Sequence, residues 1–355
     1  MRSTPAGALL VFVVASALPT GEAAAANQAK PRIPVTWSAA PCAQIVDKSQ
    51  GTTVHFEYGV GEEDVGPRTP DEVDDSRTMQ FFAFGKQDFA GKPPRWISQD
   101  DIDRAAAVDP MVVASAIEPV DILTTTSRFT GDDWRRVTAD DARVPITFAQ
   151  AAMGVDWDVT DVPPGTYVMW GYTWEPVNNE WSARPGFVKV IDDAGQAAAA
   201  GPSVALLADE AIVDVGMPHP VPGCVDVAAG STLTLQWGEL VGSLEPQWET
   251  VIDAEPVSAG ELAIDFVAPA ATAGKTVKLR AIVDDGAGHT YVAYGPRTIA
   301  VNPDAGGDAG GEAGDDDGGG GGCACAGVRA SGPRGLAVLT MLLPALVWRR
   351  RRTRR

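Results

Sequence analysis

Two short segments of this chain alternate strictly between apolar and polar side chains. Residues 53–59 read TVHFEYG and residues 232–238 read TLTLQWG. In both segments every second residue is large and apolar, while Thr, His, Glu or Gln fills most of the positions between. A period of two with one polar face predicts a half-buried antiparallel strand. A cysteine precedes each segment, Cys42 in the first case and Cys224 in the second.

The ends of the two halves also match. Residues 163–190 and 272–301 both show a strand pattern, a polar turn, a second strand pattern, and then a proline before a last strand. The alternating segments lie 179 residues apart, whereas Pro185 and Pro296 lie 111 apart. The difference predicts an insertion of about 68 residues in the first copy, near 61–143. The rival explanation is a chance resemblance between amphipathic strands.

We therefore predict a mainly β protein with two immunoglobulin-like or fibronectin-like β-sandwich domains. The first spans 30–191 and carries the insertion, and the second spans 203–301. The small-residue segment between them, 192–202, is the predicted linker. Within the insertion, Ser98 and Asp101 are placed to cap a short helix.

The chain is acidic, with a formal net charge of −19, although six arginines crowd into its last seven residues. The region between the two ends is therefore more acidic than the total indicates. Such a surface repels phosphate backbones and disfavours binding of nucleic acid. A solubilising surface explains the acids most simply, and capture of Ca²⁺ is the alternative. We predict no other cofactor.

Residues 1–26 have the three parts of a secretory signal peptide. A positive charge stands near the start, an apolar run covers 6–18, and small residues at 23–26 offer a cleavage site. The apolar run is too short for a lasting membrane span. Export would place the protein in an oxidising compartment, where Cys42 and Cys224 could form a disulfide. Two buried free thiols are the alternative.

The sequence holds few candidates for catalysis. No HExxH, GxSxG or P-loop pattern accompanies its three histidines, His55, His219 and His289. Acidic doublets recur in and near the insertion, at 74–75, 100–101, 132–133 and 140–141. Paired carboxylates suit glycoside hydrolysis or Ca²⁺ binding, but none of these has the spacing of an EF-hand loop. A solvated surface explains the doublets more simply.

Four tryptophans of the first domain lie close together along the chain: Trp157, Trp170, Trp174 and Trp181. Trp170 and Trp174 share one face of the predicted strand, because their separation is even. With Trp181 they could form a stacking platform for sugar rings. The alternative is core packing, because sandwich domains commonly bury such rings. The platform would predict a polysaccharide or protein ligand at the cell surface.

The composition changes abruptly after the second domain. Residues 302–322 are almost all Gly, Asp and Ala, which predicts a disordered spacer. Cys323 and Cys325 follow, and then an apolar run at 335–348 that leads into the arginine cluster. We expect residues 323–355 to hold a transmembrane helix with its arginines on the cytoplasmic side.

This order of a Gly-rich spacer, Cys-x-Cys, a short hydrophobic helix and terminal arginines resembles the MYXO-CTERM sorting domain of myxobacterial surface proteins. The resemblance covers residues 318–355. It implies recognition by a membrane-embedded sorting protease, processing at the Cys323–Cys325 pair, and attachment of a lipid at Cys323. The protein would then be held at the cell surface through its C-terminus. The resemblance implies nothing about the domains, because such tails are joined to many unrelated proteins.

These patterns predict an exported, surface-anchored protein that serves binding, adhesion or envelope structure and is not an enzyme. Two alternatives stay open. One is a secreted hydrolase whose site lies in the insertion, and the other is a Ca²⁺-dependent adhesin. Turnover of glycosidase, esterase or protease substrates would favour the hydrolase, and a calcium-induced rise in melting temperature would favour the adhesin.

Overall fold

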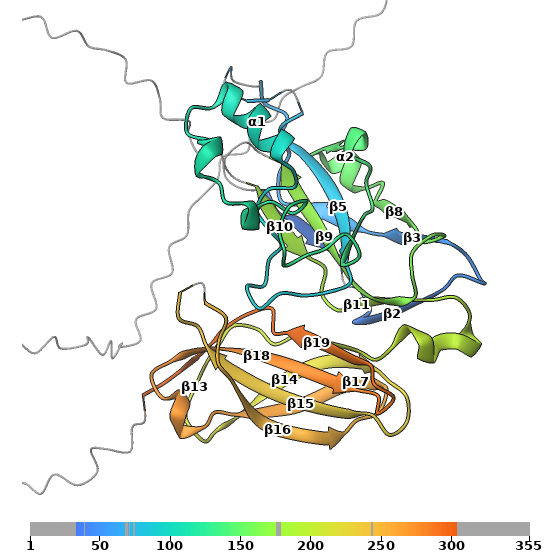
Figure 1. Cartoon of the computed structure of the whole chain (residues 1–355), viewed down its shortest axis with the longest axis vertical. Coiled ribbons are helices and arrows are strands. Elements are labelled where there is room, and N and C mark those ends of the chain that lie inside the picture. Colours follow the sequence, from blue (N-terminus) through green and yellow to red (C-terminus); the bar gives the residue numbers. More distant parts are fainter. Residues whose placement is uncertain are drawn as a thin grey trace, which may run out of the picture. The chain divides into compact units, whose positions relative to one another are not determined.

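The computed structural model describes residues 33–303, except residues 39, 68–69, 71, 74, 175–178 and 243. The predicted signal peptide, and all residues from 304 onward, lie outside the described residues. Both halves of the described region consist mainly of strands (Figure 1). The prediction of a mainly β protein is confirmed for this part of the chain.

The first half of the described region is a β-sandwich. Its strands are β1 (Val35–Trp37), β2 (Ala43–Asp47), β3 (Thr53–Phe56), β4 (Tyr58–Val60), β5 (Thr78–Phe84), β6 (Trp134–Arg136), β7 (Val144–Pro145), β8 (Val155–Asp158), β9 (Gly165–Trp174), β10 (Glu180–Ala183) and β11 (Phe187–Ile191). The main sheet has the order β2-β11-β9-β5-β6, with β10 paired to β9 and β7 paired to β5. Two small sheets, β1–β4 and β3–β8, complete the sandwich, and residues of all three sheets share one buried core.

The second half is a sandwich of two sheets. Its strands are β12 (Ser203–Leu206), β13 (Ala211–Val213), β14 (Pro218–Asp226), β15 (Thr232–Glu239), β16 (Trp248–Pro256), β17 (Gly260–Val267), β18 (Thr276–Asp284), β19 (Thr290–Tyr294) and β20 (Ile299–Val301). One sheet has the order β12-β14-β17, and the other has the order β13-β20-β18-β15-β16 with β19 paired to β18. Apolar side chains of both sheets form the core between them.

Both alternating segments are strands with one buried face. In β3, Val54 and Phe56 are buried while Thr53 and His55 are exposed. In β15, the buried side chains include Leu233, Leu235 and Trp237, and the residues between them are half-exposed. The predicted period of two is confirmed in both strands.

The two sandwiches share one strand order. The main sheet of the first, β2-β11-β9-β5-β6, matches β13-β20-β18-β15-β16 in the second. In each, the first pair is parallel, β2 with β11 and β13 with β20. The order β12-β14-β17 is repeated by β1–β4 and β3–β8, because β3 and β4 together occupy the place of β14. This is an immunoglobulin-like arrangement of strands.

The structure corrects the predicted alignment of the repeat. Residues 53–59 form β3 and β4 of the small sheets, whereas residues 232–238 lie in β15 of a main sheet. The true counterpart of β15 is β5, which is buried on both faces and therefore carries no alternation. The insertion predicted near 61–143 is accordingly displaced. Since β5 is a central strand, the extra residues lie at 85–154, between β5 and β8.

Most of the inserted residues, 85–143, form a cap on the outer face of the first main sheet. Its main helix is α1 (Gln99–Val108), which lies beside the sheet of β5, β9 and β10 (Figure 1). The predicted cap of this helix is present, because Ser98 Oγ accepts a hydrogen bond of 3.2 Å from the backbone N–H of Asp101. The other helical elements of the inserted segment are the 3₁₀ turns η1 (Ala114–Ala116), η2 (Pro119–Asp121) and η3 (Asp140–Ala142) and the short helix α2 (Phe148–Ala151), and it also holds the strands β6 and β7.

The cap and the sheet bury a second core between them. Apolar side chains of the cap, such as Ile102 and Ile122, pack with aromatic side chains of β5, β9 and β10. The first main sheet is therefore buried on both faces. In β9, nine of the ten residues are buried, which is why this strand reads as a nearly continuous apolar run.

A disulfide between Cys42 and Cys224 joins the two sandwiches, with Cα atoms 5.9 Å apart. Cys42 lies directly before β2, and Cys224 lies within β14. Phe187 and Ala205 are buried around the bridge, so each sandwich contributes apolar surface to it. The sequence left open whether these two cysteines form a disulfide or remain free thiols, and the structure shows the disulfide.

The predicted linker, residues 192–202, holds the 3₁₀ helix η4 (Ala194–Ala200), which contacts β11. Beside it, the ammonium of Lys189 lies 2.6 Å from a carboxylate oxygen of Asp226 in the second sandwich. The Lys189 side chain is only 4% exposed. The two sandwiches therefore form one compact unit.

Candidate functional site

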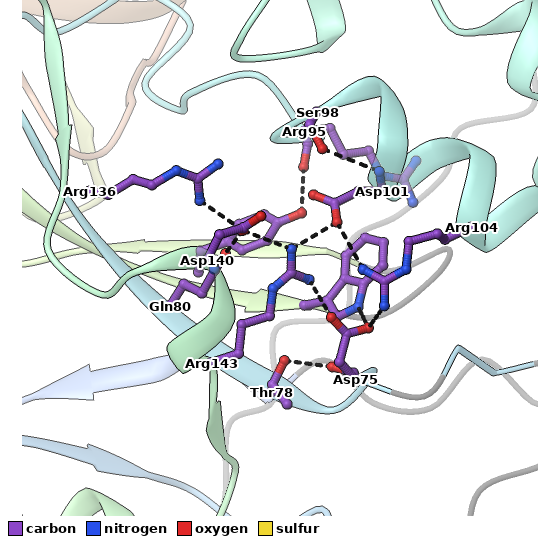
Figure 2. Close-up of polar contacts among 12 residues, drawn as sticks. Asp75, Thr78, Gln80, Arg95, Ser98, Asp101, Arg104, Arg136, Asp140 and Arg143 are labelled. Atoms are coloured by element: carbon purple, nitrogen blue, oxygen red, sulfur yellow. Dashed lines mark hydrogen bonds and ion pairs between the residues drawn. The ribbon is translucent and has the colours of Figure 1, made fainter.

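A buried cluster of opposite charges fastens the cap to the sheet. The side chain of Arg143, at the end of the cap, is only 5% exposed. One guanidinium nitrogen lies 2.8 Å from Asp101 of α1 and 3.2 Å from Asp140, and another lies 3.3 Å from Asp75 (Figure 2). One arginine therefore holds three carboxylates from separate segments of the chain.

Two further groups bind the carboxylate of Asp75. Arg104 of α1 approaches it to 2.5 Å, and the indole N–H of Trp174 in β9 donates a hydrogen bond of 3.1 Å to it. The guanidinium of Arg143 also lies over the Trp174 ring, 5.1 Å from its centroid. The cluster thus ties α1, β9 and the segment before β5 to one another.

The electrostatic environment favours the charged forms of Asp140 and Arg143. Partial burial acts to raise the pKa of Asp140, but a hydrogen bond from Gln80 and the charge of Arg136 outweigh it, so that the pKa lies below its usual value. Burial acts to lower the pKa of Arg143, but the adjacent carboxylate of Asp101 raises it above its usual value. A general acid for hydrolysis needs a carboxyl whose pKa is raised, and Asp140 shows the opposite shift.

Three of the acidic doublets of the sequence contribute one member each to this cluster: Asp75, Asp101 and Asp140. The acids thus converge, as the hydrolase alternative requires, but they converge on arginines. The sequence analysis missed Arg143. The signal that could have found it is a basic residue two positions after the doublet Asp140–Asp141, since a buried carboxylate needs a cation nearby.

A second buried arginine stands at the start of β5. Arg77 is 6% exposed and lies 2.8 Å from Glu72 and 3.2 Å from Asp64. It also donates a hydrogen bond of 2.7 Å to the carbonyl of Gly66. Its backbone φ of 63° lies in the left-handed region, which costs energy for a residue with a side chain. The ion pairs offset that cost, so this arginine organises the chain before the central strand.

The predicted stacking platform on the surface is wrong. Trp174 is fully buried, Trp181 is 4% exposed and Trp170 is 9% exposed. The cap covers the face that these rings share, and the indole N–H of Trp181 donates to the carbonyl of Pro94 in the cap at 2.9 Å. Core packing, the alternative that the sequence left open, is what the structure shows for all three rings.

A cavity of about 580 Å³ lies where the two sandwiches and the beginning of the cap come together. The first sandwich contributes Trp170, Trp181 and the turn before β11, and the cap contributes residues 86–88 and 91–93. The second sandwich contributes the ends of β12 and β19 and the residues that follow each of them. Its aromatic lining consists of Phe84, Phe129, Trp170, Trp181 and Tyr294.

Charged side chains of both signs surround the cavity. The basic ones are Lys86, Lys92, Arg184 and Arg297, and the acidic ones are Asp88, Glu180 and Asp209. Lys92 and Glu180 form an ion pair of 2.8 Å, and the Lys92 side chain is 55% exposed. Asp88 is paired with Arg128 at 2.7 Å. The site therefore offers aromatic surface together with hydrogen-bond donors and acceptors.

Several contacts fix the walls of this cavity. The backbone N–H of Tyr294 donates a hydrogen bond of 3.1 Å to the side-chain carbonyl of Gln87 in the cap. Gly186 has a φ of +82°, and a Cβ at this position would overlap the backbone of Cys42. The turn at the cavity wall therefore lies against the chain of the disulfide and needs glycine. These contacts fix the positions of two segments of the cavity wall.

The histidines lie apart from one another in the described structure. His55 of β3 is 2.7 Å from Asp156, and His289 is 2.7 Å from Asp285. Both imidazole rings are more than half exposed, and His219 lies in β14. Among the described residues, no group of three or more His, Cys, Asp or Glu side chains could hold a metal ion.

The residues of the predicted sorting tail, Cys323 and Cys325 among them, lie outside the described residues. So does the apolar run at 335–348. Within the part of the chain that the structure describes, no helix is long and apolar enough to cross a membrane.

The strand order and the cavity define a class: a mainly β protein of two immunoglobulin-like sandwiches with a cavity at their junction. No family model and no curated protein matches this chain. Among solved structures, it is similar to an ectodomain fragment of ICAM-5, domains D1–D4, and to a marsupial T cell receptor.

The ICAM-5 fragment is 12% identical, and the alignment covers 76% of this chain and 51% of that fragment, with a TM-score of 0.18. The chain thus matches about half the length of that fragment. The T cell receptor is 10% identical, and the alignment covers 74% of this chain and 98% of the receptor, with a TM-score of 0.22. At these TM-scores neither likeness bears on function, and the fold rests on the strand order described above.

Proposed function

We propose that this protein is an exported binding protein, displayed at the cell surface, that holds a ligand in the cavity between its two sandwiches. The observation that carries the proposal is the cavity itself. Both sandwiches and the cap contribute to its walls, and a disulfide and several polar contacts fix their positions. Preformed cavities of about 300–1000 Å³ with aromatic walls and a few polar groups are typical of ligand sites.

The disulfide supports export, because such bonds persist in oxidising compartments outside the cytoplasm. The sequence of residues 1–26 supports the same route. For display, we propose that residues 318–355 act as a MYXO-CTERM-type sorting signal and that a lipid is attached at Cys323. The buried charge cluster supports a binding role over hydrolysis, since its carboxylates are neutralised by arginines.

The test of the binding site uses the whole exported protein and a cavity-blocking variant. Ala183 lines the cavity and is exposed, so Ala183→Trp fills the site without disturbing a core. Ala229→Trp, in an exposed turn away from the cavity, is the matched control. A panel of oligosaccharides, peptides and fatty acids is screened by the shift in melting temperature. We expect a stabilising compound whose effect is lost in Ala183→Trp and kept in Ala229→Trp; a panel without any such compound contradicts the proposal.

The variant Cys323→Ala tests the proposed anchoring at the cell surface. We expect it to appear in the medium or to keep its unprocessed tail, while the wild type is retained at the cell surface. Fractionation with an antibody to the sandwich domains measures both outcomes, and mass spectrometry of the retained protein detects the lipid. Equal surface retention of variant and wild type contradicts a lipid anchor at this cysteine.

A further inference from the structure

We infer that the cavity between the sandwiches takes a short neutral oligosaccharide. The inference rests on the proposed binding function and names the class of its ligand. It follows from two properties of the lining, its aromatic walls and the mixed sign of the charges around it. The aromatic lining favours a ligand with an apolar face, and the charges argue against the two other common classes, wholly apolar and highly charged ligands.

The aromatic walls favour a ligand with a flat apolar face. Trp170 and Trp181 add little open surface to the lining, because they are 9% and 4% exposed and their rings pack edge to face 6.3 Å apart in the core beneath the cap. The half-buried ring of Tyr294 in the second sandwich is the part of the aromatic lining that a ligand can reach. The C–H faces of sugar rings stack on such side chains, because the ring faces carry partial negative charge and the C–H groups partial positive charge.

The charges argue against an acyl chain or another wholly apolar ligand. Such a ligand would cover Lys92, Glu180 and Asp88 without offering them hydrogen bonds, and covering polar groups in this way is unfavourable. Sugar hydroxyls both donate and accept, so they satisfy ammonium and carboxylate groups alike. In the Lys92–Glu180 pair, 2.8 Å apart, donor and acceptor stand side by side, as the two hydroxyls of neighbouring sugar carbons require.

The mixed sign also argues against a highly charged ligand. An anion gains from the four basic side chains of the lining but meets three acidic ones, Asp88, Glu180 and Asp209, around the same cavity. A cation is attracted by the acidic side chains but repelled by the basic ones. The chain as a whole has a net charge of −19, so a polyanion is also repelled on approach. A neutral ligand rich in hydroxyl groups is the class that incurs neither cost.

The pairings within the lining leave room for such hydrogen bonds. Asp88 is already held by Arg128 at 2.7 Å, and Lys86 donates to the carbonyl of Arg128 at 3.0 Å. A carboxylate has about four acceptor positions and an ammonium three donors, so each group can serve a ligand without giving up its present partner. Binding a sugar therefore does not require the lining to rearrange.

The experiment is calorimetric titration of the whole exported protein with five-residue oligomers of glucose and of N-acetylglucosamine. An anionic oligomer of galacturonic acid and dodecanoate represent the two excluded classes. We expect at least one neutral oligomer to bind, with an affinity that changes less than about twofold between 0.05 and 0.5 M NaCl, because screening affects only charged partners. Ala183→Trp is expected to weaken this binding by tenfold or more, and Ala229→Trp to leave it unchanged.

Glu180→Gln tests whether the carboxylate of Glu180 accepts hydrogen bonds from the sugar. It keeps the size of a side chain that is 15% exposed and removes the charge, so the fold is retained while the charge-assisted acceptor is lost. We expect about a tenfold loss of affinity for the neutral oligomer, with an unchanged melting temperature of the free protein. Unchanged affinity in this variant, or in Ala183→Trp, overturns the assignment of the sugar to this cavity.

The remaining outcomes separate this inference from the proposed function. If dodecanoate or the galacturonic acid oligomer binds in a manner that Ala183→Trp abolishes, while neutral oligomers do not bind, the ligand class is wrong and the binding function stands. If none of the probes binds, and the wider panel of the proposed function also fails, both are overturned.

Discussion

The two sandwiches follow one strand order but complete their main sheets differently. In the first, the connection from β5 to β8 occupies residues 85–154 and supplies the cap. In the second, the equivalent connection from β15 to β17 occupies residues 240–259 and holds only β16. The shared topology therefore does not decide which faces of a sheet are buried. The length of one connection decides it.

This difference is visible in two equivalent strands. In β9 of the first sandwich all residues but Gly165 are buried. In its counterpart β18, buried residues alternate with half-exposed ones from Arg280 to the end of the strand. Covering both faces turns an alternating strand into a continuous apolar run, as in sheets that are layered on both sides. The four predictions below test how far the cap accounts for the contrast.

The largest effect is expected from a pair of tryptophans on the two outer faces. Trp174→Ala removes a fully buried ring beneath the cap and should lower the free energy of unfolding by about 3–5 kcal/mol. Trp248→Ala on the uncapped face removes a half-exposed ring that lies 4.3 Å from the Arg280 guanidinium, for an expected loss of about 1–2 kcal/mol. Calorimetry and urea unfolding measure both. Equal losses would mean that the cap does not distinguish the two faces.

The next largest loss in the free energy of unfolding is expected for Arg143, which fastens the cap to the sheet. Arg143→Ala leaves Asp101, whose side chain is 3% exposed, without its nearest cation, and we expect a loss of about 3 kcal/mol. The matched control is Arg135→Ala, since Arg135 lies 4.0 Å from a fully exposed Asp132 and such pairs contribute less than about 1 kcal/mol. Hydrogen exchange of α1 shows whether the cap is released. An exchange rate in α1 equal to that of the control would contradict the fastening role.

Sequence reasoning succeeded where the signal for an element lies within that element. Strands with one buried face, such as β3 and β15, were predictable because their alternation is a local signal. The capped helix was predictable for the same reason, since Ser98 and Asp101 belong to one turn. The mainly β, two-sandwich fold followed from such signals.

What sequence reasoning missed depends on contacts between distant segments. β5 lost its alternation because the cap covers its second face, so the repeat was aligned on β3 instead. The tryptophans looked like a surface platform because nothing in their own strands indicates a cover from residues 85–143. The cavity combines side chains of two sandwiches, and no local pattern announces such a site.

The disulfide is the feature that couples the two sandwiches, and removing it sharpens the comparison. The bridge joins residues 182 positions apart, and because a disulfide typically contributes about 2–4 kcal/mol, we expect a loss of that size for the double variant of Cys42→Ala and Cys224→Ala. Without the bridge we expect calorimetry to resolve two transitions, one for each sandwich. A single transition at the temperature of the wild type would mean that the polar contacts alone couple them.

The smallest effect is confined to one turn of the second sandwich. A hydrogen bond from His289 is the main cause that lowers the pKa of Asp285 from 3.8 to about 2, helped by backbone N–H donors of His289 and Ala287. Because the pKa is lower in the folded state, this pair stabilises the fold above the usual pKa of 3.8, and the contribution is lost as the pH falls through about 2.

The variant His289→Ala separates the imidazole from the backbone donors. In an NMR titration of the Asp285 carboxyl, we expect its pKa to rise toward 3.8 but to stay below it, because the backbone N–H groups of residues 287 and 289 remain as donors. The turn lies far along the chain from the cap, so hydrogen exchange of α1 should be unchanged in this variant. A pKa that stays near 2 would show that the backbone donors alone lower the pKa of Asp285. The His289 side chain would then make no contribution, and Asp285 would keep its charge whatever residue stands at position 289.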